Sequence, residues 1–205
     1  MRILLIVGSP RANRGTGGTI EIPRADGAPI VVPADSCTDR LAAAFADGAR
    51  AAGHEVVRFS LHDHPAIGPC RACYGCVKTG RCVLKDDMSL LYPEFDAADA
   101  VVFATPLYYA TLPAQVLAIV NRLYPYWIDN IRYPKLKGAG VIGVCADSWQ
   151  SWDLFDATWK SIFGEIGWTN LGILHAPDFE SRRDEFLAAA RQFGLALAPE
   201  RKTIR

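Results

Sequence analysis

The sequence predicts an α/β fold in which one parallel β-sheet of five strands carries α-helices on both faces. Two patterns lead to this prediction. Short, continuous apolar runs recur along the chain, and such runs are typical of parallel strands that are buried on both faces. Between them lie longer segments whose apolar residues recur every three or four positions, as on one face of a helix. Because the two patterns alternate, right-handed β–α–β connections are expected.

Five apolar runs are the candidate strands. The first is RILLIV, which begins at Arg2 and ends before Gly8. The other four are HEVVRFSL at 54–61, AVVFATP at 100–106, GVIGVC at 140–145 and LGILHA at 171–176. The continuous apolar character of RILLIV suits a parallel strand that is buried on both faces.

Four segments have apolar stripes at helical spacing, and a fifth, Asp86–Ala98, begins with two aspartates that suit a helix N-terminus. The four stripes are Leu41, Phe45, Ala49 and Ala52; Leu112, Val116, Ile119 and Leu123; Trp152, Phe155, Trp159, Ile162 and Ile166; and Phe186, Ala190, Phe193 and Leu197. The pattern shows no linker or repeat, so residues 1–205 are predicted to form a single domain.

One segment, about 14–35, does not fit this alternation. Thr19–Pro23 and Pro29–Pro33 have the residues of two short strands about a turn at Arg24–Gly27, which predicts an inserted β-hairpin after the first strand. The prolines favour an edge position for these strands. A flexible loop is the alternative.

Composition restricts the class of partner. Lys+Arg and Asp+Glu both number 22, so no excess of charge favours nucleic acid or an acidic membrane. No apolar run approaches the length of a transmembrane helix, and the short run at the N-terminus does not have the features of a signal peptide. We therefore expect a cytoplasmic protein without a nucleic-acid or membrane partner, whose cysteines are reduced.

The loops after the first and third strands carry candidate ligand-binding groups. Parallel sheets bind ligands beyond the carboxyl ends of their strands. Ser9 and Arg11 follow the first strand, while Ser36 and Thr38 open the helix after the insertion. Together they suit a phosphate group, although Ser36 or Thr38 could simply cap the helix. Neither a G-x-G-x-x-G nor a P-loop motif is present.

The loop after the third strand reads TPLYYATLPAQ, residues 105–115. Pro106 and the adjacent Tyr108 and Tyr109 could press against a planar ring at the edge of the sheet. Packing against the following helix is the other common role of such tyrosines.

Four of the six cysteines lie in CRACYGCVKTGRC, and they are Cys70, Cys73, Cys76 and Cys82. A C-x2-C-x2-C run supplies three ligands to a four-iron four-sulfur cluster in bacterial ferredoxins, and a fourth cysteine after Gly80 could complete the set. Zinc sites more often use two separated cysteine pairs. We interpret the segment as a cluster ligand set, with a metal-free loop or a zinc site as alternatives.

In combination, GSPR at 8–11, TPLYYATLPAQ and the cysteine segment followed by KDDM resemble the NADPH-dependent FMN reductase family. The resemblance is greatest to its iron–sulfur flavoprotein branch, and it extends from Met1 to about Arg122 and more loosely to Ala198. It implies a flavodoxin-like three-layer sandwich that binds FMN and forms a homodimer or homotetramer. In the family a glycine often stands where this chain has Ala110.

The resemblance also implies an FMN-dependent oxidoreductase that transfers electrons from NAD(P)H to a flavin, a quinone or another small acceptor. The alternative that it implies is an electron carrier that relays electrons between redox proteins through a cluster and FMN. Because a flavin performs the redox chemistry itself, no catalytic side chain is assigned. The residues implied to bind FMN are Ser9, Arg11, Ser36, Cys37 and Thr38 at the phosphate; Pro106, Leu107, Tyr108 and Tyr109 at the ring; and Ala146 and Asp147, in the loop at 145–148, on the opposite side of the ring.

Cys37 is further expected to have a lowered thiol pKa, because it lies at the predicted N-terminus of a helix. Its backbone amide, rather than its thiol, is the group expected to act at the site.

Overall fold

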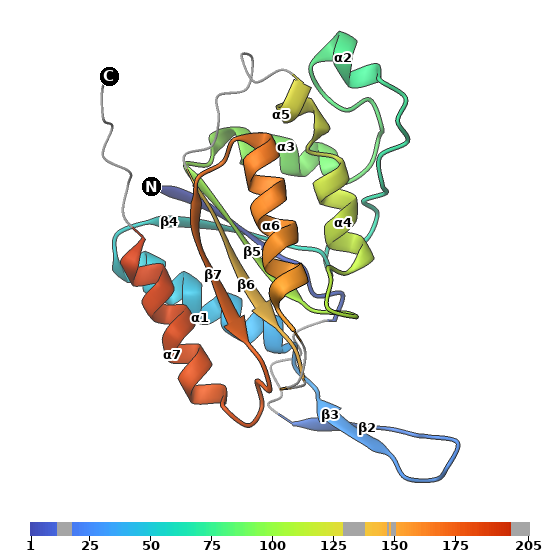
Figure 1. The fold of residues 1–205 in the computed structure, drawn as a ribbon, viewed down its shortest axis with the longest axis vertical. Helices are drawn as coiled ribbons and strands as arrows, with labels where there is room; N and C mark the ends of the chain where they lie inside the picture. The colour runs from blue at the N-terminus through green and yellow to red at the C-terminus, as the bar shows by residue number, and fades with distance from the viewer. Residues whose placement is uncertain (12–17, 129–137, 147, 149–150, 198–205) are drawn as a thin grey trace.

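The computed structural model describes residues 1–11, 18–128, 138–146, 148 and 151–197. At its centre is a parallel sheet of five strands in the order β4-β1-β5-β6-β7 (Figure 1). All five predicted strands are confirmed. Their bounds are Arg2–Val7 for β1, Glu55–Ser60 for β4, Ala100–Pro106 for β5, Gly138–Val144 for β6 and Asn170–Ala176 for β7.

In chain order the strands are arranged 2-1-3-4-5, which is the flavodoxin-like arrangement. The direction of winding reverses at β1, because β4 lies on one side of it and β5 on the other. A crevice for a ligand is expected at this point, beyond the carboxyl ends of β1 and β5.

Helices cover both faces of the sheet (Figure 1). α1 (Cys37–Ala51) and α7 (Arg183–Ala196) pack on one face, and α3 (Met88–Ala97), α4 (Ala114–Asn121) and α6 (Asp153–Ile166) pack on the other. These are the five predicted helices, with small differences at their ends. Two single-turn helices were not predicted from the sequence, α2 (Gly75–Thr79) and α5 (Tyr124–Ile128).

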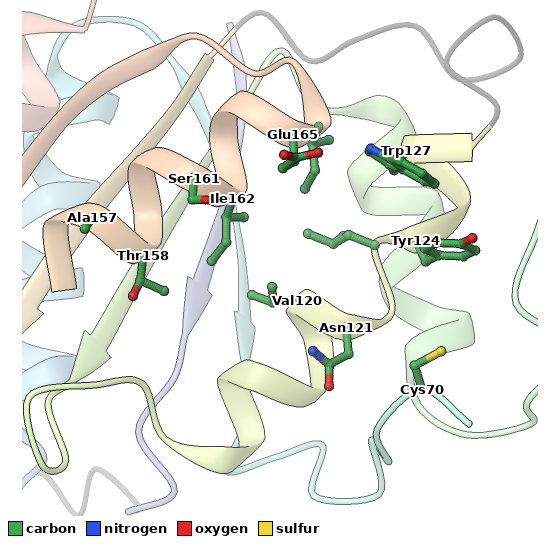
Figure 2. A pocket seen from close by; sticks show the side chains of 12 residues that line it. Cys70, Val120, Asn121, Tyr124, Trp127, Ala157, Thr158, Ser161, Ile162 and Glu165 are labelled. Carbon is green, nitrogen blue, oxygen red and sulfur yellow. The ribbon is translucent and has the colours of Figure 1, made fainter. Parts of the chain in front are cut away.

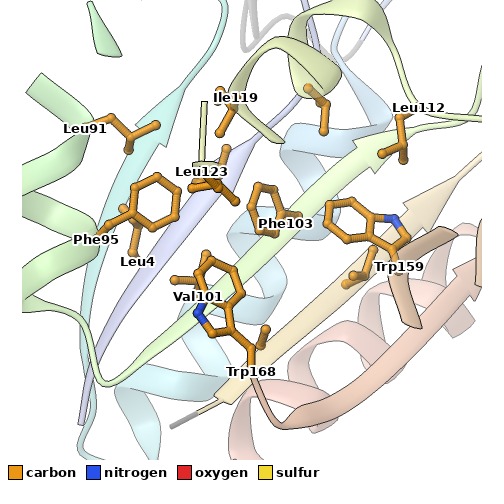
Figure 3. Close-up of a cluster of buried hydrophobic side chains, with 14 of the residues drawn as sticks. Leu4, Leu91, Phe95, Val101, Phe103, Leu112, Ile119, Leu123, Trp159 and Trp168 are labelled. Atoms are coloured by element: carbon orange, nitrogen blue, oxygen red, sulfur yellow. The ribbon is translucent and has the colours of Figure 1, made fainter. Parts of the chain in front are cut away.

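Each central strand contributes to two hydrophobic cores. In β1, Leu4 and Ile6 face α3, α4 and α6, while Ile3 and Leu5 face α1 and α7. Figure 3 shows the first core, in which the rings of Phe103 and Trp159 lie 4.8 Å apart. Burial on both faces explains why the strands are continuous apolar runs.

α1 and α7 approach one another unusually closely. A Cβ atom built on Gly48 would lie 1.9 Å from the carbonyl oxygen of Arg191, and one on Gly194 would lie 2.2 Å from the carbonyl oxygen of Phe45. These contacts join backbone to backbone, so neither helix has room there for any side chain.

The predicted hairpin is present and forms a small sheet of its own. β2 (Thr19–Ile22) pairs antiparallel with β3 (Ile30–Pro33), and the pair projects from the end of the domain towards which β6 and β7 point (Figure 1). None of the helices in the described ranges is both long and apolar enough to cross a membrane.

Candidate functional site

The residues predicted to bind a phosphate come together at the carboxyl end of β1. Ser9, Ser36 and Thr38 are all buried there. The backbone amide of Arg11 donates to Ser9 Oγ at 3.2 Å, and the Arg11 guanidinium donates to the carbonyl oxygen of Pro33 at the base of the hairpin. The inserted segment therefore returns the chain to the same loop from which it departs, and the two sequence-distant halves of the predicted phosphate site lie side by side.

Ser36 is the N-cap of α1, and its Oγ accepts a hydrogen bond from the backbone amide of Asp39 at 3.3 Å. The capping role weighed from the sequence is thus real. The Ser36 hydroxyl also donates to the Asp39 carboxylate, which acts to lower the pKa of Asp39, although burial outweighs this and raises that pKa. The first backbone amides of α1 have no partner within the helix, which makes this end electropositive.

Two carboxylates near this helix end are neutralised by arginines. Asp39 pairs with Arg58, and Glu180 pairs with Arg40 and Arg183. Burial acts to raise the pKa of Glu180, but hydrogen bonds from Arg183 and Cys37 outweigh it and hold the pKa below its usual range. Arginines therefore balance these two carboxylates, while Asp35, directly before the N-cap, is a further buried acidic residue at this helix end.

The expected low pKa of Cys37 is wrong. Burial, followed by the hydrogen bond to Glu180 Oε1 at 3.2 Å, raises the pKa of the Cys37 thiol to about 11. Burial and the adjacent carboxylate both disfavour a thiolate at this position. Only the backbone amide of Cys37 is therefore suited to an anion.

This gives a testable prediction for Cys37. In a variant whose other five cysteines are serine, alkylation by iodoacetamide is expected to rise with pH around a midpoint of about 11, because the thiolate is the reactive form. In Glu180→Gln the midpoint should fall towards the ordinary value. Mass spectrometry at a series of pH values measures it, and a midpoint below 9.0 in the parent protein would contradict the assigned environment.

The predicted ring-binding loop forms a tight turn beyond β5. Tyr108 and Thr111 exchange two backbone hydrogen bonds of 3.0 Å, and Tyr109 and Ala110 between them have φ values of 52° and 58°. The side chain of Tyr109 is 96 % exposed, whereas Leu107 is buried in the core. Of the predicted ring contacts, Pro106, Tyr108 and Tyr109 lie at the surface or part-way to it, and Leu107 instead anchors the loop.

Positive φ at two successive non-glycine residues is strained. Ala110→Gly is therefore expected to raise the free energy of unfolding by about 0.5–1 kcal/mol, since glycine adopts this conformation without a Cβ penalty. The same substitution at Ala43, on the exposed face of α1, should lower the free energy of unfolding by about 1 kcal/mol. Urea denaturation of both variants measures this pair, and equal signs would contradict the prediction.

The loop after β6, predicted to reach the other side of the ring, is described only in part. Cys145 is buried and Ala146 is exposed; Asp147 lies outside the described residues. A neighbouring cluster was missed. His175, one residue before the end of β7, stacks on Trp152 with ring centroids 4.4 Å apart, and its Nε2 lies 2.6 Å from Asp156 Oδ1. The only signal in the sequence was a histidine near the carboxyl end of a predicted strand.

The cysteine segment forms a second candidate site. Its four cysteines line one cavity of about 210 Å³, together with Arg71, Ala72, Tyr74, Leu84 and Tyr124. Cys70 and Cys73 are exposed, while Cys76 is buried. The backbone amide of Ala72 donates to Cys70 Sγ at 3.4 Å. Burial, and then the three neighbouring thiols, raise the pKa of Cys76. The predicted ligand set is thus gathered around a common space.

The shape of this cavity bears on the alternatives for the cysteines. Among the residues that the structure describes, no three histidine, cysteine or acidic side chains converge closely enough to hold one metal ion. The four cysteines instead line a common cavity of about 210 Å³. Ala72 and Tyr74 have φ values of 50° and 54°, and amides in such alternating backbone form the anion-binding concavities found at iron–sulfur sites. The donor set therefore fits a cluster.

A groove of about 740 Å³ adjoins this cavity, and Cys70 and Tyr124 line both (Figure 2). Its other lining residues come from the C-terminal end of α4, from Leu123, from α5 and from α6 between Ala157 and Ile166. The Tyr108–Thr111 turn precedes the N-terminus of α4, so the two candidate sites lie at opposite ends of this helix. Trp127 in the groove is half exposed, whereas Tyr126 packs on Phe95 in the chain's own core.

Solved structures with the same fold include redox enzymes. An NAD(P)H:quinone oxidoreductase from Methanothermobacter marburgensis superposes with a TM-score of 0.70 at 17 % identity, over 97 % of this chain and 99 % of that one. An azoreductase from Bacillus anthracis superposes with a TM-score of 0.59 at 15 % identity, over 95 % and 96 % of the two chains. At such identities the likeness establishes the fold alone.

Sequence relatives are more specific but match over shorter stretches. An iron–sulfur flavoprotein from Archaeoglobus fulgidus is 38 % identical over 72 residues, which are 35 % of this chain and 31 % of the relative. One from Methanosarcina thermophila is 39 % identical over 56 residues, 27 % of this chain and 29 % of the relative. The matched stretches thus span about a third of these relatives. A family model for NADPH-dependent FMN reductases matches residues 1–151, and the chain belongs to this family.

Proposed function

We propose that the protein is an FMN-dependent oxidoreductase that takes electrons from NAD(P)H and passes them to a flavin, a quinone or another small acceptor. The observation that carries this proposal is the edge of the sheet at β1 and β5. There the buried hydroxyls of Ser9, Ser36 and Thr38 lie at an electropositive helix end, and an exposed tyrosine turn stands beyond the neighbouring strand. Residues suited to a phosphate group and residues suited to a planar ring therefore lie at the same edge of the sheet, where one ligand could contact both.

The residues present fit FMN. Ser9, Arg11, Ser36, Thr38 and the amide of Cys37 would hold its phosphate, while Pro106, Tyr108 and Tyr109 would contact its ring. The cofactor supplies the hydride and single-electron chemistry when bound. The protein's own contribution is to orient the ring through the strained turn, whose backbone is fixed to β6 by the bond from Leu107 N to Val144 O at 2.8 Å.

The experiment is performed on the protein reconstituted with FMN under anaerobic conditions. Bleaching of the flavin absorbance by NADPH or NADH, followed by re-oxidation by a soluble quinone, is the expected result. Thr158→Ala removes a hydroxyl from the distant groove rather than from this edge, and it is expected to bind FMN and react as the parent protein does. Absence of flavin binding would overturn the proposal, and binding without reduction by either nucleotide would leave only a flavin-binding module.

A second candidate function is an electron carrier that relays electrons between redox proteins through a cysteine-bound cluster. It is favoured by the four cysteines that surround one cavity at the protein surface, with an N–H···S hydrogen bond of 3.4 Å. Iron and acid-labile sulfide are measured on protein purified without oxygen. We expect about four irons per chain, lost in Cys73→Ser and Cys76→Ser and retained in the matched control Cys145→Ser, whose thiol is buried elsewhere.

A further inference from the structure

Arg122 is a charged side chain in an otherwise apolar interior. It is 1 % exposed and lies immediately after α4. Its Nη1 donates to Asp86 Oδ2 at 2.7 Å, and its Nη2 donates to Asp86 Oδ1 at 3.1 Å. Burial acts to raise the pKa of Asp86, but the bonds from Arg122 and from a backbone amide outweigh it and lower the pKa. Both side chains are therefore charged at neutral pH, and they form a bidentate ion pair.

The same pair fastens both ends of the cysteine segment. Arg122 Nη1 also donates to the carbonyl oxygen of Gly68 at 2.9 Å, and the amide of Gly68 donates to Asp86 Oδ2 at 3.2 Å. Gly68 precedes the first of the four cysteines and Asp86 follows the last. Gly68, Asp86 and Arg122 thus hold the two ends of the cysteine segment together and close it into a loop. We call this three-residue junction the neck of the loop.

Inside the loop, three contacts reach other parts of the fold: Arg81 pairs with Asp96, Tyr74 packs on Tyr124, and Cys82 packs against the core. The other contacts are local. Backbone bonds join Val77 N to Tyr74 O and Gly80 N to Cys76 O, which is one short turn of helix. Cys70 and Cys73 are exposed and have no packing in the core. Strained backbone at Ala72 and Tyr74 needs an external constraint to persist.

A purely stabilising role is a weak explanation for the pair. Taking two charges out of water is costly, and apolar residues of similar volume often serve a core as well or better. The Nε–H of Arg122 is buried and has no partner among the described residues, which adds to that cost. What an apolar pair could not supply is the hydrogen bond to Gly68 that ties the two ends of the loop together.

We propose that Arg122 and Asp86 are positioning residues that hold the neck of the cysteine loop closed, so that the four thiols face one cavity and can receive an iron–sulfur cluster. This inference rests on the second candidate function. It assigns a role to a residue pair 36 positions apart, neither member of which is a ligand.

The test uses Asp86→Asn and the double variant Arg122→Met/Asp86→Leu. The double variant keeps an apolar core, so its urea midpoint should stay near that of the parent protein, while it removes the tie to Gly68. The matched control is Phe45→Leu, which weakens the core on the opposite face of the sheet. All proteins are purified without oxygen and assayed for iron and sulfide. Both neck variants are expected to lose most of the iron and Phe45→Leu to keep it.

A second readout does not depend on a cluster. In metal-free protein Cys76 is only 9 % exposed, so its alkylation reports opening of the loop. Because breaking a buried ion pair is strongly destabilising, this rate should rise by about tenfold or more in Asp86→Asn and stay unchanged in Phe45→Leu. If the parent protein holds no iron, the second candidate function fails. The rate of Cys76 alkylation still shows whether Arg122 and Asp86 hold the loop closed. Full iron in both neck variants, or unchanged Cys76 alkylation, would overturn the inference.

Discussion

Replacing Gly48 with alanine is expected to lower the free energy of unfolding by about 3 kcal/mol or more, because the new methyl group cannot be accommodated. Its Cβ would lie 1.9 Å from the carbonyl oxygen of Arg191 and 2.8 Å from the carbonyl carbon. Both are backbone atoms of α7, so no side-chain rotation relieves the clash, and the two helices must separate. Urea denaturation followed by circular dichroism measures the loss.

Gly164→Ala is the matched control. Gly164 lies in α6, and a Cβ atom built on it would meet nothing within 4 Å. Since alanine is a better helix former than glycine, this variant is expected to gain about 1 kcal/mol. The same chemical change should thus have opposite signs in two helices. A loss of less than about 1 kcal/mol in Gly48→Ala would show that α1 and α7 do not pack at this distance.

The central strands could be predicted because their own residues are apolar and buried, so the signal lies within each strand. In β1 and β5 both faces meet helices, so Ile3–Val7 and Ala100–Ala104 are apolar without a break, and the run itself marks the strand. The long helices were predictable for a similar reason, since α6 shows one stripe of Phe155, Trp159 and Phe163 towards the sheet. The hairpin was predicted because its turn residues are local in sequence.

Features that depend on distant partners left no such pattern. Gly48 and Gly194 look like ordinary helix-weakening glycines until the helices that carry them are brought together. Arg122 sits beside an apolar stripe as if it were a surface residue, and only the fold reveals its contact with Asp86. The wrong expectation for Cys37 has the same origin. Its helix end was visible in the sequence, but Glu180, which is 143 positions away, was not.

α2 and α5 were missed for a local reason. Each has five residues, which is too short for an apolar stripe to repeat. α2 begins with a glycine and ends before Gly80, while α5 contains Pro125. Both contribute residues to the cysteine cavity or the groove beside it, so these irregular parts shape one candidate site.

Arg11→Ala is expected to weaken FMN binding by about tenfold to a hundredfold, because hydrogen bonds to charged groups contribute roughly 1.5–3 kcal/mol. Arg11 lies beside the buried Ser9 and donates a hydrogen bond to the carbonyl oxygen of Pro33. Its truncation therefore removes both a positive charge and this hydrogen bond from the predicted phosphate site. Fluorescence titration of metal-free apoprotein with FMN measures the dissociation constant. Riboflavin, which has no phosphate, should bind the parent protein and the variant with similar affinity.

The control for this change is Arg24→Ala, which removes an arginine from the turn of the inserted hairpin. Arg24 pairs with Asp26 in the turn of the hairpin at 2.9 Å, and both side chains are about half exposed. We expect its FMN affinity to match that of the parent protein. If Arg11→Ala weakened FMN and riboflavin equally, Arg11 would act by holding the hairpin and the loop after β1 in place. Loss of affinity for FMN alone would instead place the phosphate at the junction of β1, the hairpin and α1.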